Sequence, residues 1–453
     1  MSPGAPLPRP GEAERLPRIL VLAPLCVLLG LVVGRVVPGG SVTGSSWYLP
    51  AAGLLLATGL YGSTHRIEPA AMRRDLRTVT VVVTLGVLLK ATLIAGVMVL
   101  LFRRPEYLVL GIAVAQIDPL SVAALSNDSR MSPRAKTLLS VWAAFDDPMT
   151  VLLSLYFSLL AYRLSGRSGT PALAPEGNGA AAYVEGIALN AALFAAAVAV
   201  WFAVRRLTRA IAVRRAAGRI RANRMKQPGR THSGGPAGAI RRSAVAGSRP
   251  SGSAGSPRSS GSAGSSVTDV LAFLVVVALI AVAAYWMLML AVALTGLVVR
   301  TGRFQDQVDK LVNVAFLVAA FGLGVLLTDG VSLGTGVVLG TAAFAAQAAV
   351  ARLIMPRLVP DLSRNDQVFL ALGQQNGITA IILALALEPD FPGTVGIVGP
   401  AILTIGVLYY ASNGLWGRRM RAAADDPSDV RRRIQVKPNP VTAGARTGPE
   451  GPF

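Results

Sequence analysis

Apolar residues gather in long runs, separated by short stretches rich in arginine, glycine and proline. A helix that crosses the hydrocarbon core of a bilayer needs about 20 predominantly apolar residues. By this measure each of ten runs predicts one transmembrane helix: 19–37, 48–63, 78–102, 107–125, 137–162, 180–204, 311–327, 331–351, 368–387 and 395–416. The stretch 267–299 is too long for one such helix and predicts two, broken near Tyr285 and Trp286. The pattern predicts an all-α polytopic membrane protein with about twelve transmembrane helices.

Composition agrees with a membrane protein and excludes other classes. Of the 453 residues, 53% are hydrophobic and 15% are charged, too few charges to cover the surface of a soluble domain. The single cysteine, Cys26, lies inside the first apolar run, which excludes a disulfide framework. His65 and His232 are far apart in basic loops, so the sequence predicts no His/Cys metal cluster and no bound cofactor.

Positive charge predicts the orientation of the chain in the membrane. With both termini on the same side, 38 of the 44 lysines and arginines fall in segments on that side, and only 4 fall in the opposite loops. Cytoplasmic loops carry the excess of Lys and Arg, so we expect a multi-pass protein of the cytoplasmic membrane with both termini inside. The net charge of +21 does not favour nucleic acid as a partner, because the basic patches flank apolar segments and face lipid headgroups.

A basic segment divides the chain into two halves. Residues 205–266 hold 14 Lys and Arg and no acid. The basic stretch after residue 204 is expected to begin as an interfacial helix, and its Gly/Ser-rich continuation after Pro228 to form a linker. The predicted organisation has four parts: a first membrane half (1–204, six spans), a cytoplasmic linker (205–266), a second membrane half (267–417, six spans) and a basic cytoplasmic tail (418–453).

Ionisable side chains well inside apolar runs are costly and therefore point to function. Four such residues are present: Lys90, Asp118, Asp146 and Asp147. Asp118 precedes Pro119, which cannot donate a hydrogen bond to the carbonyl of Ala115, so this helix is predicted to be interrupted. A proline kink beside a structural aspartate is the alternative. Four other acids lie near segment ends, where water and headgroups reach them: Glu185, Asp269, Asp329 and Glu388.

Asp146 and Asp147 form a neighbouring pair directly before Pro148 in the fifth apolar run. Adjacent residues on a helix point about 100° apart, so both can line one cavity. Two carboxylates at low dielectric repel each other and titrate together, which lets a proton compete with a cation for the site. Pro148 is expected to break the helix and to free the carbonyl of Ala144 as a hard oxygen ligand. A structural pair that caps a broken helix is the alternative.

The second half contains a comparable interruption. Three amides and two glycines disturb the run 368–387, and Gln375, Asn376, Gly377 and Thr379 are expected to support the site. An interrupted crossing helix in each half predicts inverted repeats, spans 3–5 and 10–12, around a site at the midplane. The glycines of the tenth span, Gly336 and Gly340, predict close helix packing, and these glycines are given no chemical role.

With these motifs the chain resembles the monovalent cation/proton antiporter superfamily, the sodium/proton exchangers. Asp118-Pro119 resembles that family's Thr-Asp-Pro crossing, and Asp146-Asp147 resembles the paired aspartates of its electrogenic branch. The segment Gln375–Ala380 resembles its late Arg-Gly-Ala segment. The resemblance covers nearly the whole membrane region and excludes the linker and the tail.

The resemblance implies a secondary antiporter and not an enzyme. It implies exchange of protons for a monovalent alkali cation, with Na⁺ expected, by alternating access in a homodimer with a dimerisation domain and a sliding core domain. Asp147 would then carry the cation and the proton. Asp146 would be the second titrating carboxylate, and Asp118 would balance the partial charges of the broken helices.

Two departures from the family pattern concern charge. Ile117 stands where the family usually has threonine, and Asn376 stands where it usually has a basic residue. Lys90 is a possible charge partner for Asp146, with a snorkelling or lipid-facing lysine as the alternative. Because nothing in the sequence holds Lys90 near the aspartates, electrogenic exchange by two free carboxylates is favoured. A permanent Lys90 pair with Asp146 would instead leave Asp147 to trade one proton for one cation.

Two other functions fit parts of the pattern. A transport-inactive sensor would signal through the linker and tail, although no folded soluble domain is recognisable in either. An intramembrane aspartyl protease would need Asp118 and Asp147 on facing helices with a shared water, and the Gly-x-Gly-Asp motif of such proteases is absent. Antiport is the predicted function.

Overall fold

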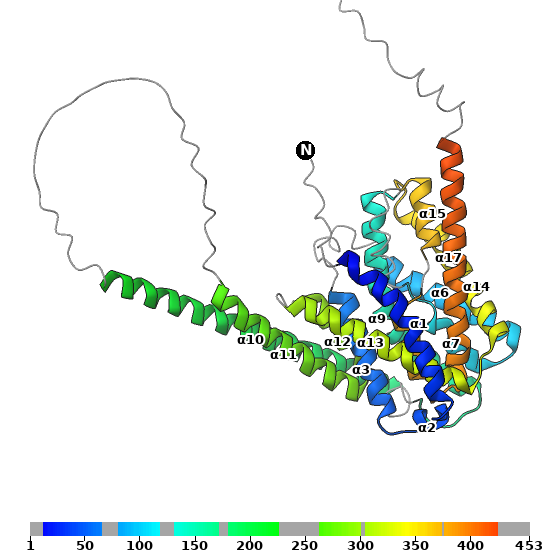
Figure 1. The fold of residues 1–453 in the computed structure, drawn as a ribbon, viewed down its shortest axis with the longest axis horizontal. Coiled ribbons are helices and arrows are strands. Elements are labelled where there is room, and N and C mark those ends of the chain that lie inside the picture. Colours follow the sequence, from blue (N-terminus) through cyan, green and yellow to red (C-terminus); the bar gives the residue numbers. More distant parts are fainter. Residues whose placement is uncertain are drawn as a thin grey trace, which may run out of the picture.

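The described part of the protein is a bundle of helices. The computed structural model describes residues 12–65, 80–117, 131–171, 180–225, 262–299, 304–373 and 376–424, and these residues form no β-strand (Figure 1). Six of the described helices are long and apolar enough to cross a membrane, and shorter apolar helices accompany them. An all-helical polytopic membrane protein is thereby confirmed, while the total of twelve spans stays a prediction.

The helices of the first half follow the apolar runs of the sequence. They are α1 (Glu12–Gly34), α2 (Gly39–Thr43), α3 (Tyr48–His65), α6 (Val87–Phe102), α7 (Leu108–Ala113), α9 (Pro133–Leu164) and α10 (Ala180–Met225). A π-helical turn, η1 (Val82–Gly86), leads into α6, and a 3-10 turn, η2 (Pro105–Tyr107), leads into α7.

The second half contains eight described elements. They are α11 (Ser262–Trp286), α12 (Met289–Val298), α13 (Gln305–Leu326), the 3-10 turn η4 (Leu327–Asp329), α14 (Leu333–Leu358), α15 (Arg364–Leu372), α16 (Ile378–Leu387) and α17 (Thr394–Ala424). The predicted break of the stretch 267–299 is confirmed, because α11 ends at Trp286 and Met287 adopts a left-handed conformation with φ +53°.

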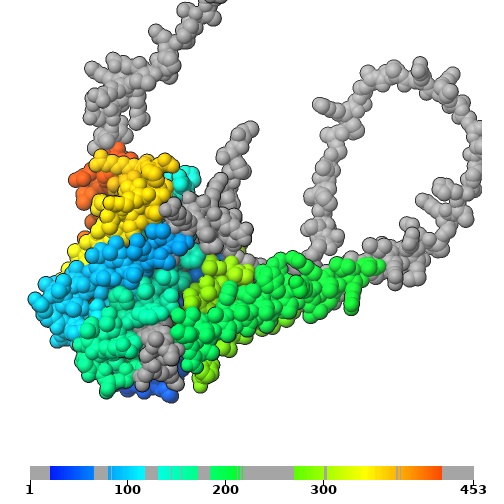
Figure 2. Space-filling view, turned by 180° about the vertical axis from the view of Figure 1, so that it is seen from behind, coloured from blue at the N-terminus to red at the C-terminus, as the bar shows by residue number. Residues whose placement is uncertain are grey.

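The core of the bundle is organised around α3, which packs against α11, α12, α13 and α16. Elsewhere in the bundle, α1 packs along α13 and α14 packs along α17. Helices α10 and α11 lie side by side and extend away from the rest of the bundle, as Figure 1 and the view from behind in Figure 2 show. The α3 neighbourhood thus joins segments from both halves of the sequence.

Helix α10 is much longer than the apolar run that predicts it. Its 46 residues make it about 69 Å long, more than twice the thickness of about 30 Å of a hydrocarbon core. The basic stretch after residue 204 is therefore a direct continuation of the spanning helix as far as Met225. There the guanidinium of Arg205 lies over the ring of Trp201, with 4.6 Å between the guanidinium carbon and the ring centroid.

Two helical paths are interrupted inside the bundle. The first ends with α7 at Ala113 and continues without helix through Val114–Ile117. The second ends with α15 at Leu372 and resumes with α16 at Ile378, as the amides and glycines of that run predict. The first break begins upstream of Pro119, so the helix ends before the proline is reached. Asp118, Pro119 and Gln375 lie outside the described residues.

The expectation that Pro148 breaks the fifth span is wrong. Helix α9 runs without interruption from Pro133 to Leu164, with Pro148 inside it. Neighbouring helices and Ser or Thr hydroxyls can compensate for a missing amide donor in a packed membrane helix. Two residues after Pro148, the hydroxyl of Thr150 donates to the carbonyl of Asp147 over 2.9 Å, which is not the carbonyl that the proline leaves without its amide donor. Asp146 and Asp147 are accordingly placed by a continuous helix.

The glycines of α14 allow close contact with α17, as expected from the sequence. A Cβ atom at Gly340 would lie 2.6 Å from the carbonyl oxygen of Ala401 and 2.7 Å from the Cβ of Thr404. A Cβ at Gly336 would lie 2.7 Å from the Cβ of Pro400. Gly334, in the first turn of the same helix, has no such neighbour within 4 Å. Close approach of the backbones is therefore confined to one part of α14.

Gly340→Leu should destabilise the bundle, because the added side chain forces α14 away from α17. Overpacking of this kind costs about 1–3 kcal/mol. Thermal unfolding of the purified protein in detergent should show a lower midpoint for Gly340→Leu than for the matched variant Gly334→Leu, which meets open space. Equal midpoints for the two variants would contradict this packing.

Candidate functional site

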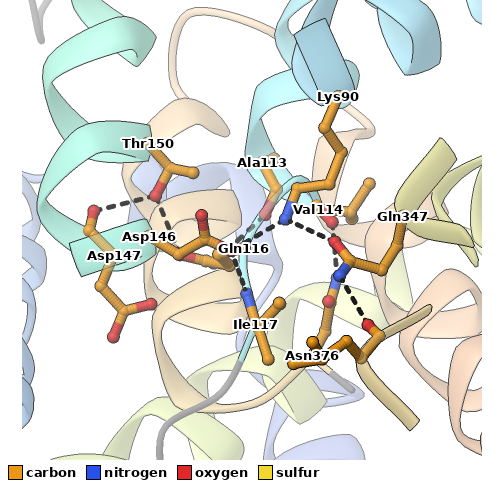
Figure 3. Close-up of polar contacts among 11 residues, drawn as sticks. Lys90, Ala113, Val114, Gln116, Ile117, Asp146, Asp147, Thr150, Gln347 and Asn376 are labelled. Atoms are coloured by element: carbon orange, nitrogen blue, oxygen red, sulfur yellow. Dashed lines mark hydrogen bonds and ion pairs between the residues drawn. The ribbon is translucent and has the colours of Figure 1, made fainter. Parts of the chain in front are cut away.

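An ion pair connects α6 and α9 in the interior of the bundle. The ammonium group of Lys90 donates to Oδ2 of Asp146 over 2.8 Å, and both side chains are fully buried, 0% exposed (Figure 3). The expectation that nothing holds Lys90 near the aspartates is therefore wrong. The sequence places the two residues 56 positions apart, and only the packing of α6 against α9 brings them together.

Neutral groups complete the surroundings of this pair. Lys90 also donates to Oε1 of Gln347 on α14 over 3.2 Å, and Oδ2 of Asp146 accepts the backbone N–H of Ile117 over 2.9 Å. The ammonium nitrogen lies 5.7 Å from the ring centroid of Trp142. A buried charge is tolerated when it is paired and hydrogen-bonded, and these contacts satisfy Oδ2 of Asp146. Its other carboxylate oxygen, Oδ1, is buried and has no hydrogen-bond partner among the described residues.

Asp147 is buried, 1% exposed, in a different environment from that of Asp146. The contact described above joins its backbone carbonyl to Thr150, and its carboxylate lies near the amide of Gln116, with 3.1 Å between Oδ1 and one end of that amide. Figure 3 shows that Asp146 faces Lys90, while the carboxylate of Asp147 points away from Lys90 and from Thr150. Two adjacent carboxylates in the sequence are thus unequal in the fold, because the lysine binds one of them.

The two interruptions lie against each other. Nδ2 of Asn376, between α15 and α16, donates to the carbonyl of Val114, just after α7, over 3.0 Å. Gly377 precedes the first residue of α16, and Thr379 is buried in the first turn of that helix. Asn376 therefore binds the backbone of the other interruption, at a position where a basic residue would bring a charge.

Gln347 is a site residue that the sequence analysis missed. It is fully buried on α14, accepts from Lys90, and donates through Nε2 to the carbonyl of Leu370 over 3.3 Å. The sequence analysis gave the glycines of this helix a packing role only and did not consider Gln347. The available signal was a lone amide among four alanines, residues 345–349, in a membrane helix. Gln116 and Thr150, each close to an aspartate in the sequence, were missed as well.

Asp329 and Glu388 have structural roles at helix ends, as their positions near segment ends predict. Oδ1 of Asp329 accepts the N–H of Gly39 over 3.1 Å. The two carboxylate oxygens of Glu388, in the loop before α17, accept the N–H groups of Gly393 over 2.6 Å and Val395 over 2.7 Å. Burial raises the pKa of Glu388, and these two hydrogen bonds oppose the rise.

Removing one partner of the buried ion pair should be more harmful than removing both. Lys90→Leu leaves a buried carboxylate without its cation and should cost about 3–5 kcal/mol. The double variant with Lys90→Leu and Asp146→Leu replaces the pair by apolar groups and should recover most of this loss. Thermal unfolding of the single and double variants in detergent tests the cycle. Strictly additive losses would show that the pair contributes nothing.

Comparison with known proteins agrees with this geometry. Residues 11–220, which contain Lys90, Asp146 and Asp147, match the family model described as sodium/hydrogen exchanger, transmembrane. The chain is also similar in fold to the sodium proton antiporter MjNhaP1 from Methanocaldococcus jannaschii at pH 8, with a TM-score of 0.55. The two chains are 14% identical, and the similarity covers 87% of this chain and 91% of the antiporter. No curated protein sequence matches the chain.

The family match and the similarity in fold indicate the same class of protein. The matched segment carries the aspartate pair and its lysine, and the similarity in fold extends through both halves of the chain. Residues 11–220 are therefore similar to the sodium/hydrogen exchanger family, and the fold of the chain is similar to that of a sodium proton antiporter.

Proposed function

We propose that the protein exchanges protons for a monovalent alkali cation, Na⁺ first of all, across the cytoplasmic membrane. The family match and the antiporter fold support transport of these ions. The observation that carries the proposal is a pair of buried carboxylates, of which one has a fixed ammonium partner and the other does not share that ion pair. In such a site, the carboxylate outside the ion pair, that of Asp147, is the one proposed to bind the exchanged ions.

Asp147 is the proposed carrier of both ions. Its carboxylate can hold a proton or a cation, and binding of one excludes the other, which couples the two fluxes in opposite directions. An ionisable group at membrane depth is by default part of an ion pathway. Asp118 and Pro119 keep their predicted roles at the first interruption as proposals, since both lie outside the described residues.

Lys90 sets the proposed stoichiometry. Two opposite unit charges 2.8 Å apart attract each other by about 6 kcal/mol at an effective dielectric constant of about 20. Protonation of Asp146 would forfeit this attraction and weaken the hydrogen bonds to its Oδ2. We propose that these contributions outweigh the desolvation of the buried pair, so that Asp146 stays ionised beside Lys90 throughout the cycle. The electrogenic exchange favoured by the sequence required two free carboxylates. With Asp147 alone available, one proton is traded for one cation and no net charge moves.

Alternating access is the proposed movement. The interrupted helices and α9 would move as a core unit past the remaining helices, carrying Asp147 from one side of the membrane to the other. A homodimer would anchor the other helices, and the distribution of Lys and Arg supports cytoplasmic termini. The match to a transporter family model favours neither the sensor nor the protease alternative.

Asp147→Asn should abolish cation-driven proton release, because an amide cannot exchange a proton and carries no charge to bind the cation. The measurement is the collapse of the pH gradient in acid-loaded everted vesicles after addition of Na⁺. Asp306→Asn, at an exposed aspartate in the first turn of α13, is the matched control and should transport as the unchanged protein does. Undiminished exchange by Asp147→Asn would refute the site.

A further inference from the structure

The amide of Gln116 lies between three parts of the site. Gln116 follows α7, is 1% exposed, and reaches towards α9 and α16. One end of its amide group is 3.0 Å from Oγ1 of Thr150 and 3.1 Å from Oδ1 of Asp147. The other end is 2.5 Å from the backbone nitrogen of Ala380 and 3.3 Å from the carbonyl oxygen of Ala113.

Only one orientation of this amide satisfies its neighbours when the site holds no cation. With its nitrogen towards α9, Gln116 donates to Asp147 and Thr150, and its oxygen accepts the N–H of Ala380. The opposite orientation places the amide oxygen against the carboxylate of Asp147, oxygen against oxygen. In that orientation the nitrogen still has a partner, because it donates to the carbonyl of Ala113. A cation between the two oxygens would remove the repulsion.

The spacing of these atoms suits a small alkali cation. Carboxylate and amide oxygens are the ligands that hard cations prefer. Na⁺ is about as large as Ca²⁺, whose oxygen ligands lie at about 2.4 Å, and two such ligands 3.1 Å apart subtend about 80° at the ion. This angle is close to the right angle between neighbouring ligands in octahedral coordination. A larger ion would need its ligands farther apart.

We propose that Gln116 is a cation ligand whose amide turns over during the transport cycle. In the cation-free state its nitrogen donates to ionised Asp147. In the loaded state its oxygen binds the cation together with Asp147, and its nitrogen donates to Ala113. The inference rests on the proposed function, since it takes Asp147 as the carrier. It makes Gln116 a determinant of cation affinity and of the preference for small ions.

Cation binding can be measured without transport. A cation that binds only the folded protein stabilises it by RT ln(1 + c/Kd), where c is the cation concentration, so the unfolding temperature rises with the cation concentration. Unfolding of the purified full-length protein should be followed in detergent while Na⁺ replaces choline at constant ionic strength. We expect Na⁺ to stabilise the unchanged protein and not Asp147→Asn. Gln116→Leu should need at least about tenfold more Na⁺ for the same stabilisation.

Two further variants separate ligation from a structural role. Gln116→Glu keeps an oxygen towards Asp147 and should therefore bind Na⁺ better than Gln116→Leu. If Gln116 acted only as an N–H donor, an ionised glutamate could not take over its role, and the two variants would bind Na⁺ equally weakly. Asn190→Leu removes another bridging amide, whose Oδ1 accepts the N–H of Ala291, and should keep the normal Na⁺ dependence. If Gln116→Leu fails to fold, Gln116→Asn, with a shorter reach, should show weakened Na⁺ binding.

The outcomes distinguish this inference from the proposed function. Stabilisation of Asp147→Asn by Na⁺ at normal concentrations would overturn the assignment of the carrier. If Asp147→Asn loses the response while Gln116→Leu retains it unchanged, only the role of Gln116 is overturned. The same holds if Gln116→Glu binds Na⁺ no better than Gln116→Leu. A rise of the KM for Na⁺ with little change of kcat in Gln116→Leu, measured in vesicles, would support ligation further.

Discussion

The need to neutralise a buried charge dominates the centre of this protein. Lys90 and Asp146 are both removed from solvent, and separation of such a pair would leave an uncompensated charge in a low-dielectric interior. Their contacts come from α6, α9, α14 and the non-helical residues after α7. The ion pair thereby constrains how these elements pack, and it places the interruption after α7 beside the aspartates.

The same pair makes two neighbouring aspartates unequal. Asp146 binds a lysine and a backbone N–H, while the contacts described for Asp147 involve Thr150 and Gln116. A carboxylate in direct contact with an ammonium group holds its charge more firmly than one outside that ion pair, which leaves the second better able to exchange a proton for a metal ion. The proposed roles follow from this difference. Lys90 keeps Asp146 ionised, Asp147 binds the exchanged cation or proton, and the amide of Gln116 turns over when Asp147 binds the cation.

Local patterns predicted most of the helices. The apolar runs locate the described spans, and the polar segment around Asn376 and Gly377 predicts the gap between α15 and α16, because an amide-rich stretch is a strong local signal in an apolar run. The prolines predicted the positions of helix interruptions less well than the amide-rich segment did. The helix before Asp118 ends earlier than Pro119 requires, and Pro148 stays inside α9, since packing decides whether a lost amide donor is compensated.

Pairings across the bundle could not be predicted in the same way. The partners of Lys90 are 56 and 257 positions away in the sequence, and no periodicity encodes them. Gln347 stands alone among alanines, and its importance is visible only when α14 lies beside α6. The contacts within the site therefore depend on the tertiary structure. Sequence identified its acids, and the fold decides which of them is neutralised.

The most direct test of this account is the response of transport to voltage. Purified protein in proteoliposomes can exchange Na⁺ for protons under imposed potassium diffusion potentials, where each net charge moved per cycle adds about 2.3 kcal/mol of driving force per 100 mV. Because Lys90 keeps Asp146 ionised and only Asp147 exchanges ions, the account predicts the same rate at every imposed potential. A rate that rises or falls systematically with the potential would show that Asp146 also titrates, and would contradict the account.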